Sequence, residues 1–167
     1  MEPIKGKLWY QKELFLISKI LPDLAEEAEF ESDFMGPYSE LADEQTDRLR
    51  IEKIVDPKQK QLTKYGKKIA KKLEIEFTSK MNSISEMKLF LNDLTKDELL
   101  GFIYYSYPDM RDDSLEFKRI ETKRQEVAVN LFKKKKISLG KAAEISGLYQ
   151  EDVIALLQSK GVSVFAE

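Results

Sequence analysis

The chain has 167 residues, of which 42% are hydrophobic and 35% are charged. This is enough apolar material for one ordinary domain or for two to three small ones. Cysteine and histidine are both absent, which excludes disulfides, thiolate or imidazole metal sites, and histidine general bases. No apolar run approaches the ~18 residues that span a bilayer, and the N-terminus lacks a signal-peptide pattern. We therefore expect a cytoplasmic protein without membrane contact.

Charge is distributed in blocks of alternating sign along the chain. Residues 1–55 carry a net charge of −6, residues 56–72 carry +6, residues 73–122 carry −5, and residues 123–167 carry +3. Such blocks are typical of separate surfaces with separate partners, so the two basic blocks are the candidate contacts for nucleic acid. The richness in Lys and Glu suits a thermophile and equally suits an ordinary solvated helical surface.

The first 75 residues predict helices around a small hairpin. Apolar residues at helical spacing from Leu8 to Leu21 predict a first helix that stops near Pro22, followed by a short acidic helix over 23–28. Ser39, after a Gly-Pro turn, is the expected N-cap of a helix to about residue 50. Asp56 and Pro57 favour a turn between two short strands. Thr63 then caps a helix whose expected apolar face is Tyr65, Ile69, Ala70 and Leu73.

This order of three helices, a two-stranded wing and a helix is that of a winged-helix domain over residues 1–75. The stretch QLTKYGKKIAKKL (61–73) resembles the segment after the wing in many winged-helix regulators. The stretch FMGPYSEL (34–41), with the helix before it, resembles phage-associated and antitoxin-like proteins. The resemblance covers residues 8–73 and implies a regulatory DNA-binding domain.

Residues 76–122 predict a helical middle segment. Ser83 with Glu86, and Thr95 with Glu98, are spaced as capping boxes and predict helices over 84–91 and 96–105. Their apolar side chains form a surface too large to stay exposed. Tyr104, Tyr105 and Tyr107 are assigned to a core or an interface, because the acidic surroundings disfavour stacking on nucleic-acid bases. Pro108 should end the second helix.

An acidic cluster follows the middle helices and precedes the expected spine of the C-terminal part. Asp112 or Asp113 is expected to cap one long helix that runs past residue 123 towards Phe132. Asp109 and Glu116 complete the cluster, which we interpret as a helix N-terminus in preference to a weak site for divalent cations.

The sharpest pattern lies in Ile137–Val164. Two short amphipathic helices flank Gly147, which can adopt the positive φ that ends the first of them. The spacing predicts a helix-turn-helix in which Ala143 is small because the second helix crosses over it. The predicted fold is therefore mainly α: a winged-helix-like domain (1–75), a helical middle segment (76–122), and a long helix with a C-terminal helix-turn-helix (123–167).

The run ISLGKAAEISGL (137–148), followed by Lys-Gly-Val (160–162), resembles small prokaryotic proteins of an uncharacterised family that are described as antitoxins. The resemblance spans residues 123–164 and implies a role as an antitoxin with a cognate toxin as partner. Members of that family are shorter, so the resemblance says little about the first 120 residues.

The candidate nucleic-acid contacts are lysines of the two basic blocks and the start of the last helix. The lysines would bind phosphates, although a solvated lysine face is an equal alternative for the first block. Gln150 could read adenine, Tyr149 could reach phosphate and Glu151 could accept from cytosine. Glu151 and Asp152 would face a polyanion, which favours a protein partner. The candidate residues are Lys58, Lys60, Lys64, Lys67, Lys68, Lys71, Lys133, Lys134, Lys135, Lys136, Lys141, Tyr149, Gln150 and Glu151.

No nucleophile elbow, phosphate-binding glycine loop or calcium loop occurs, so we expect neither catalysis nor a cofactor or metal. The leading hypothesis is a non-enzymatic DNA-binding regulator, antitoxin-like or transcription-regulator-like, that forms a homodimer through its aromatic middle helices. The alternative is a module that binds a toxin or another protein without DNA contact. A carboxylate-based metal enzyme is a distant third.

Overall fold

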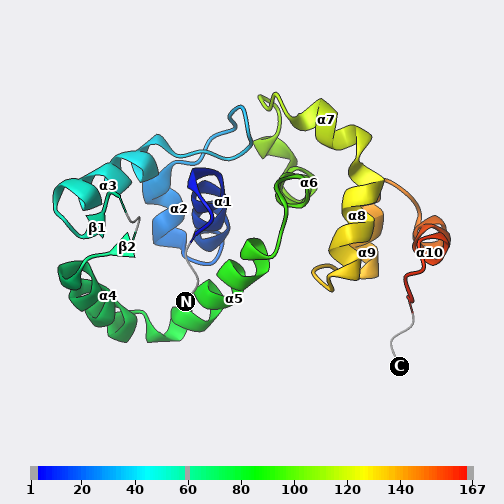
Figure 1. Cartoon of the computed structure of the whole chain (residues 1–167). Coiled ribbons are helices and arrows are strands. Elements are labelled where there is room, and N and C mark those ends of the chain that lie inside the picture. Colours follow the sequence, from blue (N-terminus) through cyan, green and yellow to red (C-terminus); the bar gives the residue numbers. More distant parts are fainter. Residues whose placement is uncertain (1–3, 59–60, 165–167) are drawn as a thin grey trace. The chain divides into compact units, whose positions relative to one another are not determined.

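A computed structural model describes residues 4–58 and 61–164, and of Glu76 it describes the backbone alone. The protein is mainly helical with one small antiparallel hairpin, as predicted (Figure 1). Within the described residues, every helix is too short or too polar to cross a membrane.

The chain forms two compact units. The first unit comprises Met1–Glu31 and Tyr38–Asn92, and the second comprises Ser32–Pro37 and Asp93–Glu167. The two helices assigned above to one middle segment thus fall in different units.

The helices of the first unit start where local capping chemistry places them. Pro22 is the first residue of α2, and the Oγ of Ser39 accepts a hydrogen bond from the N–H of Ala42 at 3.0 Å to start α3. Both predicted helix starts are confirmed. The helices of this unit are α1 (Lys7–Ser18), α2 (Pro22–Ala28), α3 (Glu40–Ile51), α4 (Lys64–Glu76) and α5 (Thr78–Asn92).

The centre of the first unit is α1, which packs against α2 and α5 (Figure 1). Phe15 is fully buried and meets Phe30 edge-on, with ring centroids 5.4 Å apart. The side-chain amide of Gln11 donates to the carbonyl of Ser39 and accepts from its N–H, both at 3.0 Å, so this buried polar group is satisfied. The Oε1 of Glu13 is buried without such a partner, and burial raises the pKa of this carboxyl to about 7.

The hairpin consists of β1 (Val55–Asp56) and β2 (Gln61–Leu62), with Val55 opposite Leu62. The Oγ1 of Thr63 accepts from the N–H of Gly66 at 3.0 Å and caps α4. Gly66 crosses so close to β1 that a Cβ there would lie 2.1 Å from the carbonyl oxygen of Ile54. The predicted hairpin and cap are confirmed.

The structure differs from two expectations for α4 and α5. The predicted apolar face of α4 is only partly covered, because Ile69 and Ala70 are half-buried whereas Tyr65 is 60% and Leu73 is 45% exposed. The Ser83–Glu86 capping box does not exist, because α5 already begins at Thr78 and leaves Ser83 exposed in its interior.

The second unit is built on α6 and α8. Gly101 lets these helices approach closely, since a Cβ there would lie 2.6 Å from Cγ1 of Val127. On α6, the side chains of Leu99, Leu100 and Ile103 are fully buried. The elements of this unit are α6 (Lys96–Ser106), the short 3₁₀ helix η1 (Pro108–Met110), α7 (Phe117–Thr122), α8 (Arg124–Lys133), α9 (Leu139–Ser146) and α10 (Gln150–Ser159).

The prediction of one long helix after Asp112 or Asp113 is wrong. The helix starts only at Phe117 and breaks at Lys123 between α7 and α8. The residues before it are held by Ser32–Pro37 instead: the N–H of Asp113 donates to Ser32 Oγ, and that of Leu115 donates to the carbonyl of Phe34, both at 3.1 Å. These bonds hold the backbone of residues 113–115 against the 32–37 segment.

Candidate nucleic-acid interface

The C-terminal segment contains two short helices, α9 and α10, which Gly147 separates. Ser138 Oγ accepts from the N–H of Lys141 at 3.2 Å to start α9, and Gly147 ends it with a φ of 72°. Tyr149 is extended and precedes α10. Ala142, Ile145, Val153 and Leu157 close the core beneath the turn. Ala142 is fully buried, whereas Ala143, which was expected to lie under the crossing, is only half-buried.

Arg124, at the start of α8, holds the end of α9. Its Nε donates to the carbonyl of Ile145 at 2.8 Å, and its Nη2 donates to that of Glu144 at 3.1 Å. These are carbonyls that a helix end leaves without an intrahelical partner. The guanidinium also lies 4.4 Å from the ring centroid of Tyr105. A Cβ at Gly147 would come within 2.6 Å of the guanidinium, so a side chain there would have to displace Arg124.

The start of α10 is exposed to solvent. Tyr149 is 84% exposed, and Gln150, Glu151 and Asp152 are exposed beside it. The Gln150 amide lies near Gly140, where a Cβ would be 3.5 Å from its Nε2, so the starts of α9 and α10 share one surface. The two carboxylates stabilise the positive end of the helix dipole, which accounts for them without a ligand.

The basic stretch before α9 is largely neutralised by neighbouring acids. Lys134 Nζ donates to Glu98 Oε2 at 2.7 Å and to the carbonyl of Asp93 at 2.8 Å. Lys136 pairs with Asp93 at 3.2 Å, and Lys141 pairs with Glu144 at 2.7 Å. Among the predicted phosphate contacts of this stretch, Lys133 and Lys135 remain exposed and unpaired within the described residues.

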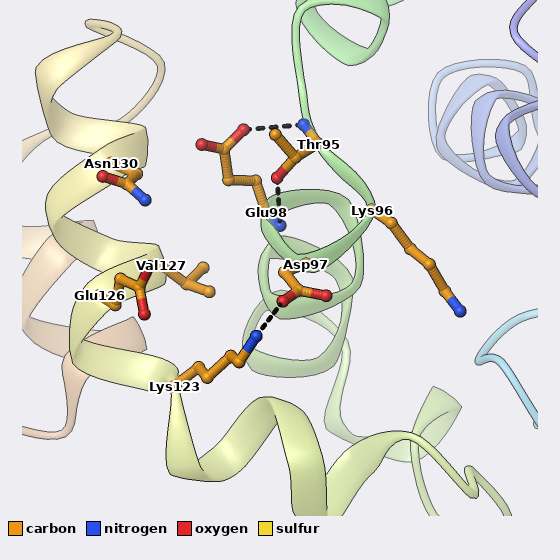
Figure 2. Close-up of a pocket in the computed structure, with 8 residues that line it drawn as sticks. All are labelled: Thr95, Lys96, Asp97, Glu98, Lys123, Glu126, Val127 and Asn130. Atoms are coloured by element: carbon orange, nitrogen blue, oxygen red, sulfur yellow. Dashed lines mark hydrogen bonds and ion pairs between the residues drawn. The ribbon is translucent and has the colours of Figure 1, made fainter.

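The start of α6 has the predicted capping box (Figure 2). The Glu98 carboxylate of this box also accepts the hydrogen bond from Lys134. Thr95 Oγ1 accepts from the N–H of Glu98 at 3.3 Å, and the Glu98 carboxylate accepts from the N–H of Thr95 at 2.8 Å. The capping box is confirmed. The shallow depression of about 380 Å³ beside it is lined by α6 and α8 residues, including Val127 and Asn130.

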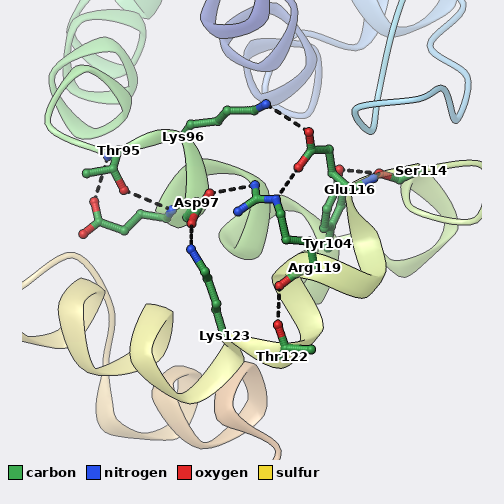
Figure 3. Close-up of polar contacts among 10 residues, drawn as sticks. Thr95, Lys96, Asp97, Tyr104, Ser114, Glu116, Arg119, Thr122 and Lys123 are labelled. Carbon is green, nitrogen blue, oxygen red and sulfur yellow. Dashed lines mark hydrogen bonds and ion pairs between the residues drawn. The ribbon is translucent and has the colours of Figure 1, made fainter.

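Several charged groups in and beside this depression belong to one network of ion pairs (Figure 3). Asp97 accepts from Arg119 at 2.7 Å and from Lys123 at 2.8 Å, which lowers the pKa of its carboxyl to about 2. Glu116 accepts from Arg119 at 2.6 Å and from Lys96 at 3.1 Å, and its pKa is lowered for the same reason. Such carboxylates are poor proton acceptors near neutral pH. The network stabilises the unit and offers little for binding an anion or for proton transfer.

The first basic block is arranged differently. The lysines of α4 and of the hairpin turn are exposed, and within the described part of the chain they make no ion pair or side-chain hydrogen bond. Lys60 lies outside the described residues. The exposed members of the predicted set, with Lys72 beside them, are Lys58, Lys64, Lys67, Lys68 and Lys71.

Sequence comparison matches only part of the chain. Residues 103–166 match an uncharacterised protein family, UPF0175. This range runs from the last turn of α6 through α10 and contains the 123–164 segment that resembles a small prokaryotic family. No curated protein and no solved structure matches the chain.

Sequence reasoning did not identify Arg124 or the neutralisation of Lys134. Arg124 bonds a carbonyl 21 residues away and Lys134 bonds one 41 residues away. No local spacing rule reports such contacts, because they exist only once α8 is packed against α6 and α9.

Proposed function

We propose that this chain is a non-enzymatic DNA-binding regulator of the antitoxin or transcription-regulator kind. The observation that supports it best is the helix pair α9–α10, whose first α10 turn is exposed while Arg124 and Gly147 fix the turn beneath it. A rigid short helix pair with a solvent-facing second helix is the arrangement that enters a major groove. In this proposal α9–α10 is a helix-turn-helix.

Affinity in this proposal comes mainly from unpaired lysines. Each lysine that neutralises a phosphate releases condensed counterions, whereas a lysine already paired with a carboxylate releases fewer. Lys133 and Lys135 supply this charge beside α9. The lysines of the hairpin and α4 supply it in the first unit, whose order of helices and hairpin fits a winged helix.

Base reading falls to Tyr149, Gln150 and Glu151 at the exposed start of α10. A glutamine amide pairs with the N6 and N7 of adenine, and a carboxylate accepts from the N4 of cytosine. Because Glu151 and Asp152 oppose a polyanion, this helix contributes sequence preference more than affinity.

The test is binding of a labelled random-sequence duplex over a range of salt concentrations. Reversing Lys64, Lys67, Lys68 and Lys71 to Glu should weaken binding strongly and lower the salt slope by roughly 0.9 per lost phosphate contact. The double reversal of Lys133 and Lys135 should do the same on a smaller scale. It spares Lys134, whose loss would also leave Glu98 without its partner.

Lys118→Glu is the matched control, because Lys118 is exposed and lies in α7 outside both basic blocks. The proposal predicts that this variant binds nearly as well as the parent. Absence of duplex binding even at low salt would refute the proposal, as would binding that is indifferent to both sets of reversals.

A protein partner is the second candidate, favoured by Glu151 and Asp152 beside the strongly exposed Tyr149. An acidic first turn with one large aromatic side chain suits a basic protein surface better than DNA. The partner would be a cognate toxin, and two copies of the chain could form a homodimer. A pulldown from native extract, with and without nuclease, separates the candidates because a protein-only complex survives nuclease.

A further inference from the structure

The guanidinium of Arg124 lies beside the turn between α9 and α10 and contacts three groups there. It bonds the carbonyls of Glu144 and Ile145 at the end of α9 and lies over the ring of Tyr105 from α6. It also fills the space that the missing side chain of Gly147 leaves. Arg124 thus adds polar contacts from α8, and a ring contact from α6, to the packing of α9 against these two helices.

We propose that Arg124 is a positioning residue that sets the direction of α10 for reading DNA sequence. This inference rests on the proposed function and adds the residue that controls its specificity. The planar guanidinium reaches two carbonyls and one aromatic face at once, which a lysine ammonium cannot reproduce. Nε and Nη2 bond carbonyls at the end of α9, so in this proposal Arg124 acts on α10 through the turn that precedes it, and a direct phosphate contact would instead change the salt slope.

This role predicts an effect on specificity with little effect on general affinity. Non-specific binding depends on lysines elsewhere, whereas base contacts require α10 to lie within a fraction of an ångström of its productive position. Loss of the Arg124 contacts should therefore reduce the preference for a selected sequence by about tenfold or more and leave the salt slope unchanged.

The experiment first selects preferred duplexes from a random pool with the parent chain. The ratio of affinities for the selected and random duplexes is then measured for Arg124→Gln and Arg124→Lys, at a temperature where circular dichroism shows each fully folded. Arg119→Gln is the matched control, because Arg119 makes comparable polar contacts to Asp97 and Glu116 and none to α9. We expect the ratio of the two affinities to fall in both Arg124 variants and to stay at the parent value in Arg119→Gln.

A double-variant cycle tests whether Gly147 and Arg124 act through the same contact. Gly147→Ala should also reduce the ratio, because its Cβ would displace the guanidinium and its φ of 72° disfavours a side chain. In the variant that combines Gly147→Ala with Arg124→Gln, the affinity ratio should fall by less than the two single reductions together. Full additivity, or an equal loss in Arg119→Gln, would overturn the positioning role.

Backbone hydrogen exchange gives a readout that needs no DNA. Gly147 N–H bonds Ala143 at 2.9 Å and Val153 N–H bonds Tyr149 at 3.0 Å, and Arg124→Gln should speed their exchange while α6 amides stay protected. Unchanged exchange would refute the inference whatever the chain binds. Faster exchange in a protein that selects no duplex would refute base reading, and with it the proposed function, while upholding Arg124 as the residue that holds the turn.

Discussion

The two basic blocks have similar lysine content but opposite structural roles. In the second unit, Lys134, Lys136 and Lys141 are tied to carboxylates, and apolar side chains of α6, α8, α9 and α10 close a continuous core. In the first unit, the lysines of α4 make no ion pair with any residue that the structure describes, and Gly66 is the one buried residue described between Lys64 and Phe90. Lysines in the second unit mainly hold the fold, and those of α4 are free to bind.

The largest test of this comparison uses one leucine from each region. Leu100 in α6 is fully buried, whereas Leu73 in α4 is 45% exposed. Leu100→Ala should lower the free energy of unfolding by about 3 kcal/mol, because it leaves a cavity in a packed core. Leu73→Ala should cost under about 1 kcal/mol. Urea unfolding of both variants measures the difference, and equal costs would show that α4 is covered after all.

The second prediction compares a paired with an unpaired lysine. Lys134→Ala should lower stability by about 2 kcal/mol, because it leaves the buried carboxylate of Glu98 without its cation. Lys68→Ala should change it by less than about 0.5 kcal/mol, since surface substitutions without partners are nearly neutral. Lys133→Ala, at the neighbouring exposed position, controls for a general effect of charge on α8. A neutral Lys134→Ala would mean that the ion pair adds nothing.

The features that could be predicted from sequence are those with local causes. Ser39, Thr63 and Thr95 cap their helices as expected, because a cap depends on a side chain and an N–H three residues away. The positive φ of Gly147 follows equally from local sterics.

The features that could not be predicted from the sequence depend on contacts between residues far apart in the chain. The residues before α7 bond the 32–37 segment, some eighty residues away along the chain, and α7 starts only at Phe117. The pairing of Lys134 depends on Asp93 and Glu98 in the same way. The exposed candidates Tyr149, Gln150 and Glu151 were found by position in α10, whereas Arg124 could not be found without the fold.

The third prediction concerns pH and the first unit. Burial raises the pKa of Glu13 to about 7, against about 4.5 in the unfolded chain, so the folded state favours the protonated form. Stability of this unit should therefore fall as pH rises from about 4.5 to about 7, by about 2 kcal/mol. Glu13→Gln should remove this loss and be the more stable protein at pH 8.

The chain has no histidine, so few other groups titrate in this window. Glu27→Gln, at an exposed position of α2, is the control and should shift stability by a nearly constant amount. Urea midpoints at pH 5 and pH 8 provide the measurement. A parent protein and a Glu13→Gln variant with parallel pH profiles would contradict a protonated, buried Glu13.

The smallest effect is expected in the second unit, and its pH dependence has the opposite sign. Bonds from Arg119 and Lys123 lower the pKa of Asp97 to about 2, so its carboxylate stabilises the fold above about pH 4 and loses that effect as pH falls through 2. Because all three side chains are partly exposed, Asp97→Asn should cost only about 1 kcal/mol at pH 7. The difference from the parent should vanish near pH 2, while Asp109→Asn, in exposed η1, should show none at either pH. A cost that persists at pH 2 would mean that Asp97 acts through packing and not through its charge.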